Sequence, residues 1–110
     1  MNCFNYIGRI EEDQRLKDSN EIIIYGAGKV GRHVLEYLKK NGMEKKITCF
    51  CDNNSGMQGT DVQGIPVLPL GKATRDCQEG TYLVASMCVR QMVESLLQYG
   101  IEDVHIIRES

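Results

Sequence analysis

The sequence predicts an α/β fold with a mostly parallel sheet, and two observations carry this prediction. β-Branched and apolar runs such as Ile22-Ile23-Ile24-Tyr25, typical of strands buried on both faces, alternate with amphipathic segments of helical period. A glycine-rich turn at residues 26–31 follows the first run and opens the first helix. Strands that alternate with helices form parallel sheets with right-handed crossovers. We therefore expect a Rossmann-like three-layer fold with strand order 3-2-1-4-5.

Five segments have the composition of strands, and each ends at a turn or cap residue. They are residues 22–25, 47–51, 65–68, 81–85 and 104–107. Pro66 lacks a backbone N–H, so the third strand is expected at an edge of the sheet. The polar stretch 53–64 has loop composition, and residues 70–77 are expected to add one or two helical turns.

Two longer helices are expected between these strands. In the first, Val30, Val34 and Leu38 recur at four-residue spacing, and the pair Asn41-Gly42 follows two lysines that suit the carbonyl end of a helix. The second helix follows Ser86, a good N-cap residue, and places its apolar residues at helical spacing up to Gly100. Both helices have one apolar face with which to cover the sheet.

Residues 1–20 differ from the rest of the chain, because Asn5 to Ser19 is polar and contains only sparse apolar positions. Their spacing predicts a short amphipathic helix that ends near Asn20. We therefore divide the chain into an N-terminal helical arm, 1–20, and a Rossmann-like nucleotide-binding domain, 21–110. The role of the arm is left open: it could cover the sheet, join a partner subunit or lead from a larger chain.

Composition limits the classes of function. The 110 residues suit one domain, and 13 basic against 15 acidic residues give a net charge of −2 with no block of one sign. This balance argues against nucleic acid as a partner. The longest run of consecutive strongly apolar residues is far too short to span a membrane. Five irregularly spaced cysteines without an apolar leader indicate reduced thiols in the cytoplasm, and Cys49 with Cys51 lacks a second ligand pair for a metal.

The glycine turn has the spacing Gly-x-Gly-x-x-Gly, and an acidic residue closes the next strand. Gly26 allows the tight turn, Gly28 lets a pyrophosphate approach the backbone, and Gly31 lets the helix lie close to the strand. The N-terminus of the helix offers free N–H groups to phosphate. Asp52 is expected to accept hydrogen bonds from ribose hydroxyls and to repel a 2′-phosphate. NAD is therefore favoured over NADP.

Ligands of open parallel sheets lie beyond the carboxyl ends of the strands, which adds residues from neighbouring strand ends to the site. No catalytic group is expected in it: His33 and His105 lack an obvious partner, and Tyr25 and Lys29 cannot share a helix face across the strand–turn junction. The predicted cofactor-binding residues are Gly26, Ala27, Gly28, Lys29, Val30, Gly31, Asp52, Asn53, Asn54, Ala85, Ser86 and Met87.

Three segments together resemble a known family. They are the strand and glycine turn over 22–31, the strand end Phe50-Cys51-Asp52-Asn53-Asn54, and Gly64-Ile65-Pro66-Val67-Leu68. Over residues 21–107 they resemble the small Rossmann-like, CoA-binding-like domain of bacterial polysaccharide-biosynthesis proteins, which also occurs in nucleotide-sugar dehydratases and epimerases. The resemblance implies a cofactor-binding domain that precedes a larger catalytic domain. Without that domain and its Tyr and Lys pair, we expect a fragment or a binding module that is not catalytic alone.

Two other resemblances keep alternatives open. The segments are similar to the nucleotide-sugar-binding domain of sugar acyltransferases, although Lys29-Val30-Gly31 replaces their usual Gly-His-Gly. The loop and Asp52 are also similar to the NAD(H)-sensing domain of potassium-uptake regulators, which lack the Gly-Ile-Pro-Val-Leu segment. NAD is thus the first expected cofactor, ahead of NADP or a nucleotide sugar. The expected partners are a homodimer mate or a catalytic domain.

Overall fold

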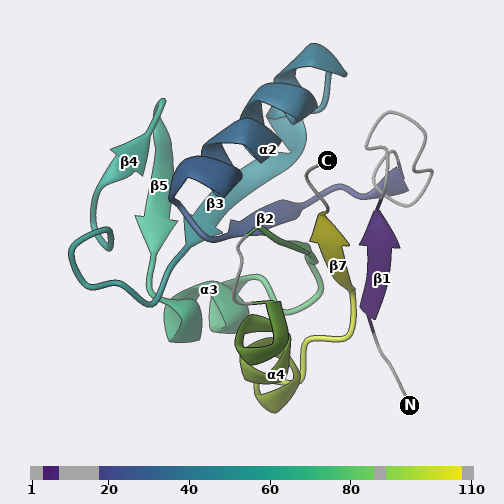
Figure 1. Ribbon diagram of the computed structural model, residues 1–110, viewed down its shortest axis with the longest axis vertical. Helices are drawn as coiled ribbons and strands as arrows, with labels where there is room; N and C mark the ends of the chain where they lie inside the picture. The colour runs from purple at the N-terminus through teal and green to yellow at the C-terminus, as the bar shows by residue number, and fades with distance from the viewer. Residues whose placement is uncertain (1–3, 8–17, 86–88, 108–110) are drawn as a thin grey trace.

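The computed structural model describes residues 4–7, 18–85 and 89–107, and these form one sheet between layers of helices (Figure 1). The strand order is β1-β7-β6-β2-β3-β5-β4. The strands are β1 (Phe4–Ile7), β2 (Ile22–Tyr25), β3 (Ile47–Cys51), β4 (Asp61–Val62), β5 (Ile65–Leu68), β6 (Thr81–Val84) and β7 (Val104–Ile107). The helices are α2 (Lys29–Lys40), α3 (Leu70–Asp76) and α4 (Val89–Gln98), with a 3₁₀ turn η2 (Glu44–Lys46).

The helices cover opposite faces of the sheet, with α2 on one face and α3 and α4 on the other (Figure 1). Successive side chains of the central strand β2 alternate between these layers, as strand geometry requires. Ile22 and Ile24 pack in the cluster that includes Leu35 of α2. Ile23 and Tyr25 pack in the cluster that includes Leu96 of α4. Because every residue of β2 is buried, both faces of this strand are core.

The predicted three-layer fold and strand order are confirmed. The order 3-2-1-4-5 is found as β5-β3-β2-β6-β7, and each neighbouring pair in this set is parallel. Two strands outside the prediction flank this set, because β4 pairs antiparallel with β5 and β1 pairs parallel with β7. The third predicted strand therefore does not lie at the edge, and Pro66 is in register with Asp61 of β4.

The prediction of an N-terminal helix is wrong for residues 4–7, whereas Asp18, near the predicted end of that helix, is helical. Phe4–Ile7 is a strand in parallel register with Val104–Ile107, so a helix does not begin at Asn5. Pairing with a distant strand outweighs the sparse helical period, because propensity is a weak guide against tertiary contacts. Residues 8–17 of the predicted arm lie outside the described residues. The boundary at residue 20 remains a prediction.

The strand β4 was missed because two residues within a polar stretch are too few to show a period. It is joined to β5 by Gln63 and Gly64, which both have positive φ, 52° and 86°. This is the backbone of a two-residue hairpin turn, in which both central residues adopt the left-handed region. Gln63 also donates to Glu36 and accepts from Lys39, so the turn is attached to α2.

Two glycines allow α2 to lie against the end of β2. A Cβ at Gly31 would lie 1.9 Å from the carbonyl oxygen of Gly26, far inside van der Waals contact. Gly26 has a φ of +112°, and a Cβ there would lie 2.6 Å from the oxygen of Ala85. The turn from strand to helix therefore depends on the absence of side chains at both positions.

We expect Gly31→Ala to lower the free energy of unfolding by about 3 kcal/mol or more, because the backbone of the turn would have to move. Gly28→Ala is the matched control, since Gly28 has a φ of −84° and a Cβ there would meet no atom within 4 Å from the part of the chain that the structure describes, its chain neighbours aside. Gly28→Ala should change the free energy of unfolding by no more than about 1 kcal/mol. Urea denaturation followed by circular dichroism measures both. Equal stabilities of the two variants would contradict the packing argument.

Candidate functional site

The carboxyl ends of three parallel strands bring the predicted segments together at one edge of the sheet. The N–H of Gly26 donates to the oxygen of Cys51 at 2.8 Å, and the N–H of Ala85 donates to the oxygen of Tyr25 at 3.0 Å. The glycine turn, the strand end before Asp52, and Ala85 are thus joined by backbone hydrogen bonds. Ser86 and Met87, which were predicted to follow Ala85 in the wall of the site at the end of β6, lie outside the described residues.

The N-terminus of α2 faces this edge without a side-chain cap. Its N-cap residue is Gly28, which supplies no acceptor for the amides of the first turn, and no acidic residue lies in that turn. The first helical bond joins the N–H of Arg32 to the oxygen of Gly28. Lys29 is exposed and adds a positive charge to the positive end of the helix dipole. Together these features favour an anion at the turn.

The side chains of the loop have unequal access to a ligand. Gly28 and Lys29 are exposed. Ala27 is fully buried, and Val30 packs against the cluster that contains Leu35. The side chain of Ala27 is therefore not accessible to a ligand, whereas that of Val30 is only partly buried.

Asp52 is bound to the glycine turn through its carboxylate. The N–H of Ala27 donates to Oδ2 at 2.9 Å, and the N–H of Asn54 donates to Oδ1 at 2.8 Å. The carboxylate is half-buried, and each oxygen keeps one further lone pair. Sequence reasoning placed Asp52 at this edge but missed its bond to the turn, which pattern alone does not reveal.

The two asparagines after Asp52 are engaged within the protein. Asn53 donates from Nδ2 to the hydroxyl of Tyr25 at 2.7 Å. The Oδ1 atom of Asn54 accepts from the N–H of Gly56 at 2.9 Å, which closes a local turn. Both residues are exposed, so they border the site while holding the loop in shape.

Tyr25 is a residue of the site that sequence reasoning missed. It ends β2 directly before the glycine turn and is 2% exposed, with its hydroxyl bonded to Asn53. Burial raises the pKa of Tyr25 above its ordinary value, against the opposing effect of hydrogen bonds with Ser95 and Asn53. The phenol therefore stays protonated and acts as a fixed hydrogen-bonding group beneath the loop. The sequence could have indicated this role, because a tyrosine at the end of a buried strand needs a hydrogen-bond partner for its hydroxyl.

Three cysteines of the described residues are buried thiols. Cys49, Cys51 and Cys77 are free, and burial raises the pKa of Cys49 to about 11 and that of Cys77 to about 12. Burial also raises the pKa of Cys51 well above its ordinary value. Thiolates are the form that attacks electrophiles and binds metals. Among the described residues, no group of three or more potential ligands could hold a metal ion.

We expect these three thiols to resist alkylation while the protein is folded. At pH 8 a thiol of pKa about 11 is ionised to roughly one part in a thousand, and iodoacetamide reacts with the thiolate. The measurement uses a Cys3→Ser/Cys88→Ser variant and mass spectrometry. All three thiols should be labelled in urea, because unfolding restores ordinary pKa values. Labelling of Cys49 at the rate of a free cysteine in the folded state would contradict this expectation.

His105 lies apart from the glycine turn. It is fully buried in β7, and its Nε2 atom is bonded to Asp103, which precedes the same strand. Asp103 also accepts from the hydroxyl of Thr81, at the start of β6, at 2.7 Å. These groups lie at the amino ends of their strands, the opposite edge from Asp52. His105 is thus placed outside the candidate site.

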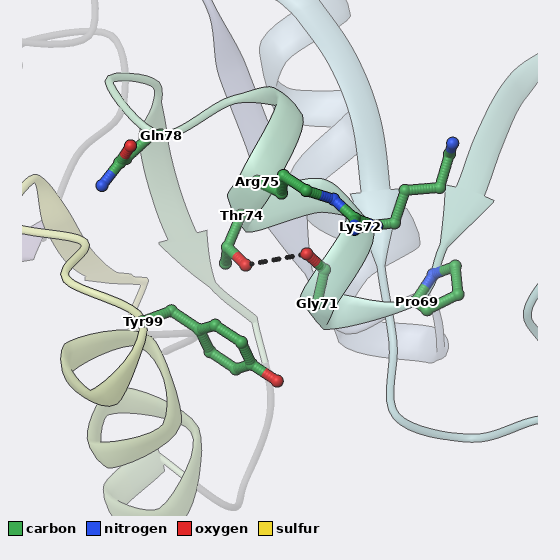
Figure 2. Close-up of a pocket in the computed structure, with 7 residues that line it drawn as sticks. All are labelled: Pro69, Gly71, Lys72, Thr74, Arg75, Gln78 and Tyr99. Atoms are coloured by element: carbon green, nitrogen blue, oxygen red, sulfur yellow. Dashed lines mark hydrogen bonds between the residues drawn. The ribbon is translucent and has the colours of Figure 1, made fainter.

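A shallow hollow lies between α3 and the end of α4 (Figure 2). Its volume is about 700 Å³, and Lys72, one of its two cationic lining residues, lies 3.8 Å from the carboxylate of Asp76. The lining residues are Pro69, Gly71, Lys72, Thr74, Arg75, Gln78 and Tyr99. None of them belongs to the predicted cofactor-binding set.

The order of the strands, the glycine turn and the acidic strand end define a domain of the Rossmann-like class. More specifically, the chain belongs to the CoA-binding domain family, whose model matches residues 17–110. Within the described residues, none of the helices has the length and apolar character needed to cross a bilayer. The CoA-binding-like part of the predicted resemblance is confirmed, whereas the narrower assignment to polysaccharide biosynthesis is not.

Two regulators are similar to this chain. The redox-sensing transcriptional repressor Rex of Brevibacillus brevis is 27% identical over 106 residues, which cover 89% of this chain and 50% of the repressor. The chain thus spans half the length of this curated relative. The crystal structure of RSP, a Rex-family repressor, superposes with a TM-score of 0.64 at 16% identity over 87% of this chain and 49% of that one. RSP has also been solved with NADH and with NAD⁺ and operator DNA.

An enzyme has the same fold. The UDP-D-quinovosamine 4-dehydrogenase of Vibrio fischeri superposes with a TM-score of 0.61 at 20% identity, over 84% of this chain and 80% of that solved chain. At these identities the solved structures establish the fold. The predicted cofactor, NAD, agrees with the dinucleotides bound in the RSP complexes.

Our expectation that nucleic acid is excluded as a partner is wrong. The RSP complex contains operator DNA, and this chain matches 49% of that repressor. A net charge of −2 describes only the present chain. The charge of one domain cannot exclude DNA as a partner of a longer protein that contains the same domain.

Proposed function

We propose that this chain is an NAD(H)-binding domain that has no catalytic activity alone. One observation carries the proposal: the uncapped N-terminus of α2 begins at Gly28, where, among the described residues other than its chain neighbours, no atom lies within 4 Å of a Cβ position. The space and the unfilled amides suit a pyrophosphate. The proposed site comprises the glycine turn 26–31, the strand-end segment 52–54 and the wall 85–87.

The position of Asp52 favours a dinucleotide whose adenosine ribose carries no phosphate. Its carboxylate lies at the end of β3 beside the turn, where the ribose of a dinucleotide lies in folds of this class. NADP carries a 2′-phosphate and coenzyme A carries a 3′-phosphate on that ribose, and like charges repel most strongly where solvent is partly excluded. We therefore place NAD(H) ahead of NADP and coenzyme A, although the family is named for the latter.

The role of the bound dinucleotide has two candidates. The first is regulation, in which NAD(H) changes how the domain contacts a second module, and the two similar repressors favour it. The second is a cofactor-binding domain of a nucleotide-sugar enzyme, which the extensive overlap with the UDP-D-quinovosamine 4-dehydrogenase chain favours. In either case the free buried thiols suit the reducing cytoplasm, where we propose that the protein acts.

A thermal-shift panel tests the ligand class. NAD⁺, NADH, NADP⁺, coenzyme A, UDP-sugars and S-adenosylmethionine would each be added at millimolar concentration. A ligand at a hundredfold its Kd stabilises by about 2.7 kcal/mol, a shift of several degrees for a domain of this size. NAD⁺ or NADH should give the largest shift. A shift with a UDP-sugar alone would favour the nucleotide-sugar enzyme, and no shift with any compound would contradict a nucleotide site.

We expect Gly28→Val to abolish NAD binding and leave the fold intact, because the added side chain occupies the space proposed for the pyrophosphate. Thr48→Val introduces the same side chain at an exposed position of β3 and serves as the control. Isothermal titration calorimetry measures the affinity, and circular dichroism checks the fold. Unchanged affinity in a folded Gly28→Val protein would remove the glycine turn from the proposed site.

Asp52→Ala should weaken NAD binding and reduce the preference for NAD over NADP. Removal of the carboxylate removes its repulsion of the 2′-phosphate, an effect of about 1 kcal/mol for a partly exposed charge pair. The measurement is the ratio of the two Kd values in the variant and in the wild-type protein. An unchanged ratio would show that another group discriminates between the two cofactors.

A further inference from the structure

Each of the four polar atoms of Asp52 is hydrogen-bonded to a different residue, and these residues lie in three segments of the protein. Its N–H donates to the oxygen of Leu68 at 3.1 Å, and its carbonyl oxygen accepts from Nε2 of Gln58 at 2.9 Å. The two carboxylate oxygens accept from the amides of Ala27 and Asn54. The residue therefore joins β5, the β3–β4 loop and the glycine turn at one point.

One carboxylate bond crosses from the end of β3 to the glycine turn, beside the backbone bond from the N–H of Gly26 to the oxygen of Cys51. Ala27 and Asp52 are separated by 25 residues, and their bond runs from the middle of the glycine turn to the end of the neighbouring strand. Charge-assisted bonds to backbone N–H groups are about twice as strong as neutral ones. Asp52 therefore adds a charge-assisted bond to the middle of the turn, where Ala27 lies beyond the backbone bond of Gly26, before any ligand arrives.

We infer that Asp52 is a positioning residue for the phosphate site: its carboxylate affects ligand affinity mainly by holding the glycine turn through the N–H of Ala27, while its bond to Asn54 fixes the carboxylate itself. This inference rests on the proposed function, and it assigns to Asp52 a role besides contact with ribose. A turn held in its binding geometry loses less conformational entropy when phosphate binds. The charge of the same carboxylate still disfavours ligands with a phosphate on the ribose.

Asp52→Asn separates positioning from ribose contact. An asparagine amide can still donate to and accept from ribose hydroxyls, but it has one acceptor oxygen for two backbone N–H groups. Its NH₂ group would face an amide donor of Ala27 or Asn54. At most one of the two backbone bonds is kept, and it is no longer charge-assisted, so the turn is held less firmly while the capacity to bind ribose is kept.

The first arm of the test uses the protein without ligand. Amide hydrogen exchange measured by NMR should be at least about tenfold faster for Ala27 in Asp52→Asn than in the wild-type protein, because the amide loses its charged acceptor. The control is Asp61→Asn, which removes the same charge from an aspartate that accepts from Gly64 in the β4–β5 turn. Exchange at Ala27 should be unchanged in the control. Equal exchange in Asp52→Asn and wild type would overturn the inference.

The second arm compares NAD⁺ with an analogue that lacks both hydroxyls on the adenosine ribose. If Asp52 acts through the turn, Asp52→Asn should weaken both ligands by the same factor, about tenfold. A loss confined to NAD⁺ would show direct ribose contact and would overturn the inference. If the wild-type protein binds neither ligand, the proposed function fails, and the exchange of Ala27 then decides the positioning role alone.

Discussion

The close contact between the first turn of α2 and the end of β2 determines the rest of this structure. Only a hydrogen atom fits at Gly31, where a Cβ would lie 1.9 Å from the oxygen of Gly26. This contact lets α2 cover its face of the sheet with Val34, Leu35 and Leu38. It also points the N-terminus of the helix at the edge where β2, β3 and β6 end. The same few atoms thus serve the core and the candidate site.

The core of the fold could be predicted from the sequence because its signals are local. Ile22-Ile23-Ile24-Tyr25 is buried throughout, as its composition predicted. The alternation of strand segments with amphipathic helices, together with right-handed crossovers, predicted the order of the five central strands. The flanking strands were missed for a physical reason. Residues 4–7 become a strand through pairing with residues 104–107, and no pattern within the first segment reveals a partner so distant.

In the candidate site too, features set by residues close in sequence could be predicted, whereas contacts between distant residues could not. The glycines and Asp52 could be placed at one edge from their spacing, since parallel strands end together. The bond from Ala27 to Asp52 and the bond from Asn53 to Tyr25 depend on side-chain directions across neighbouring strands. The net charge led to the wrong exclusion of nucleic acid as a partner, because it too carries no information from outside the segment considered. It describes the present chain, whereas the similar repressors are about twice as long.

The pairing of β1 with β7 has a consequence for the order in which the protein folds. The register joins Phe4 to Val104, so the first described strand of the chain finds its partner in the last. During synthesis on a ribosome, β1 emerges early and must wait until nearly a hundred further residues have been translated. The central strands can assemble in that interval, since their partners are closer in sequence. Closure of the β1 edge is thus a late step, coupled to completion of β7.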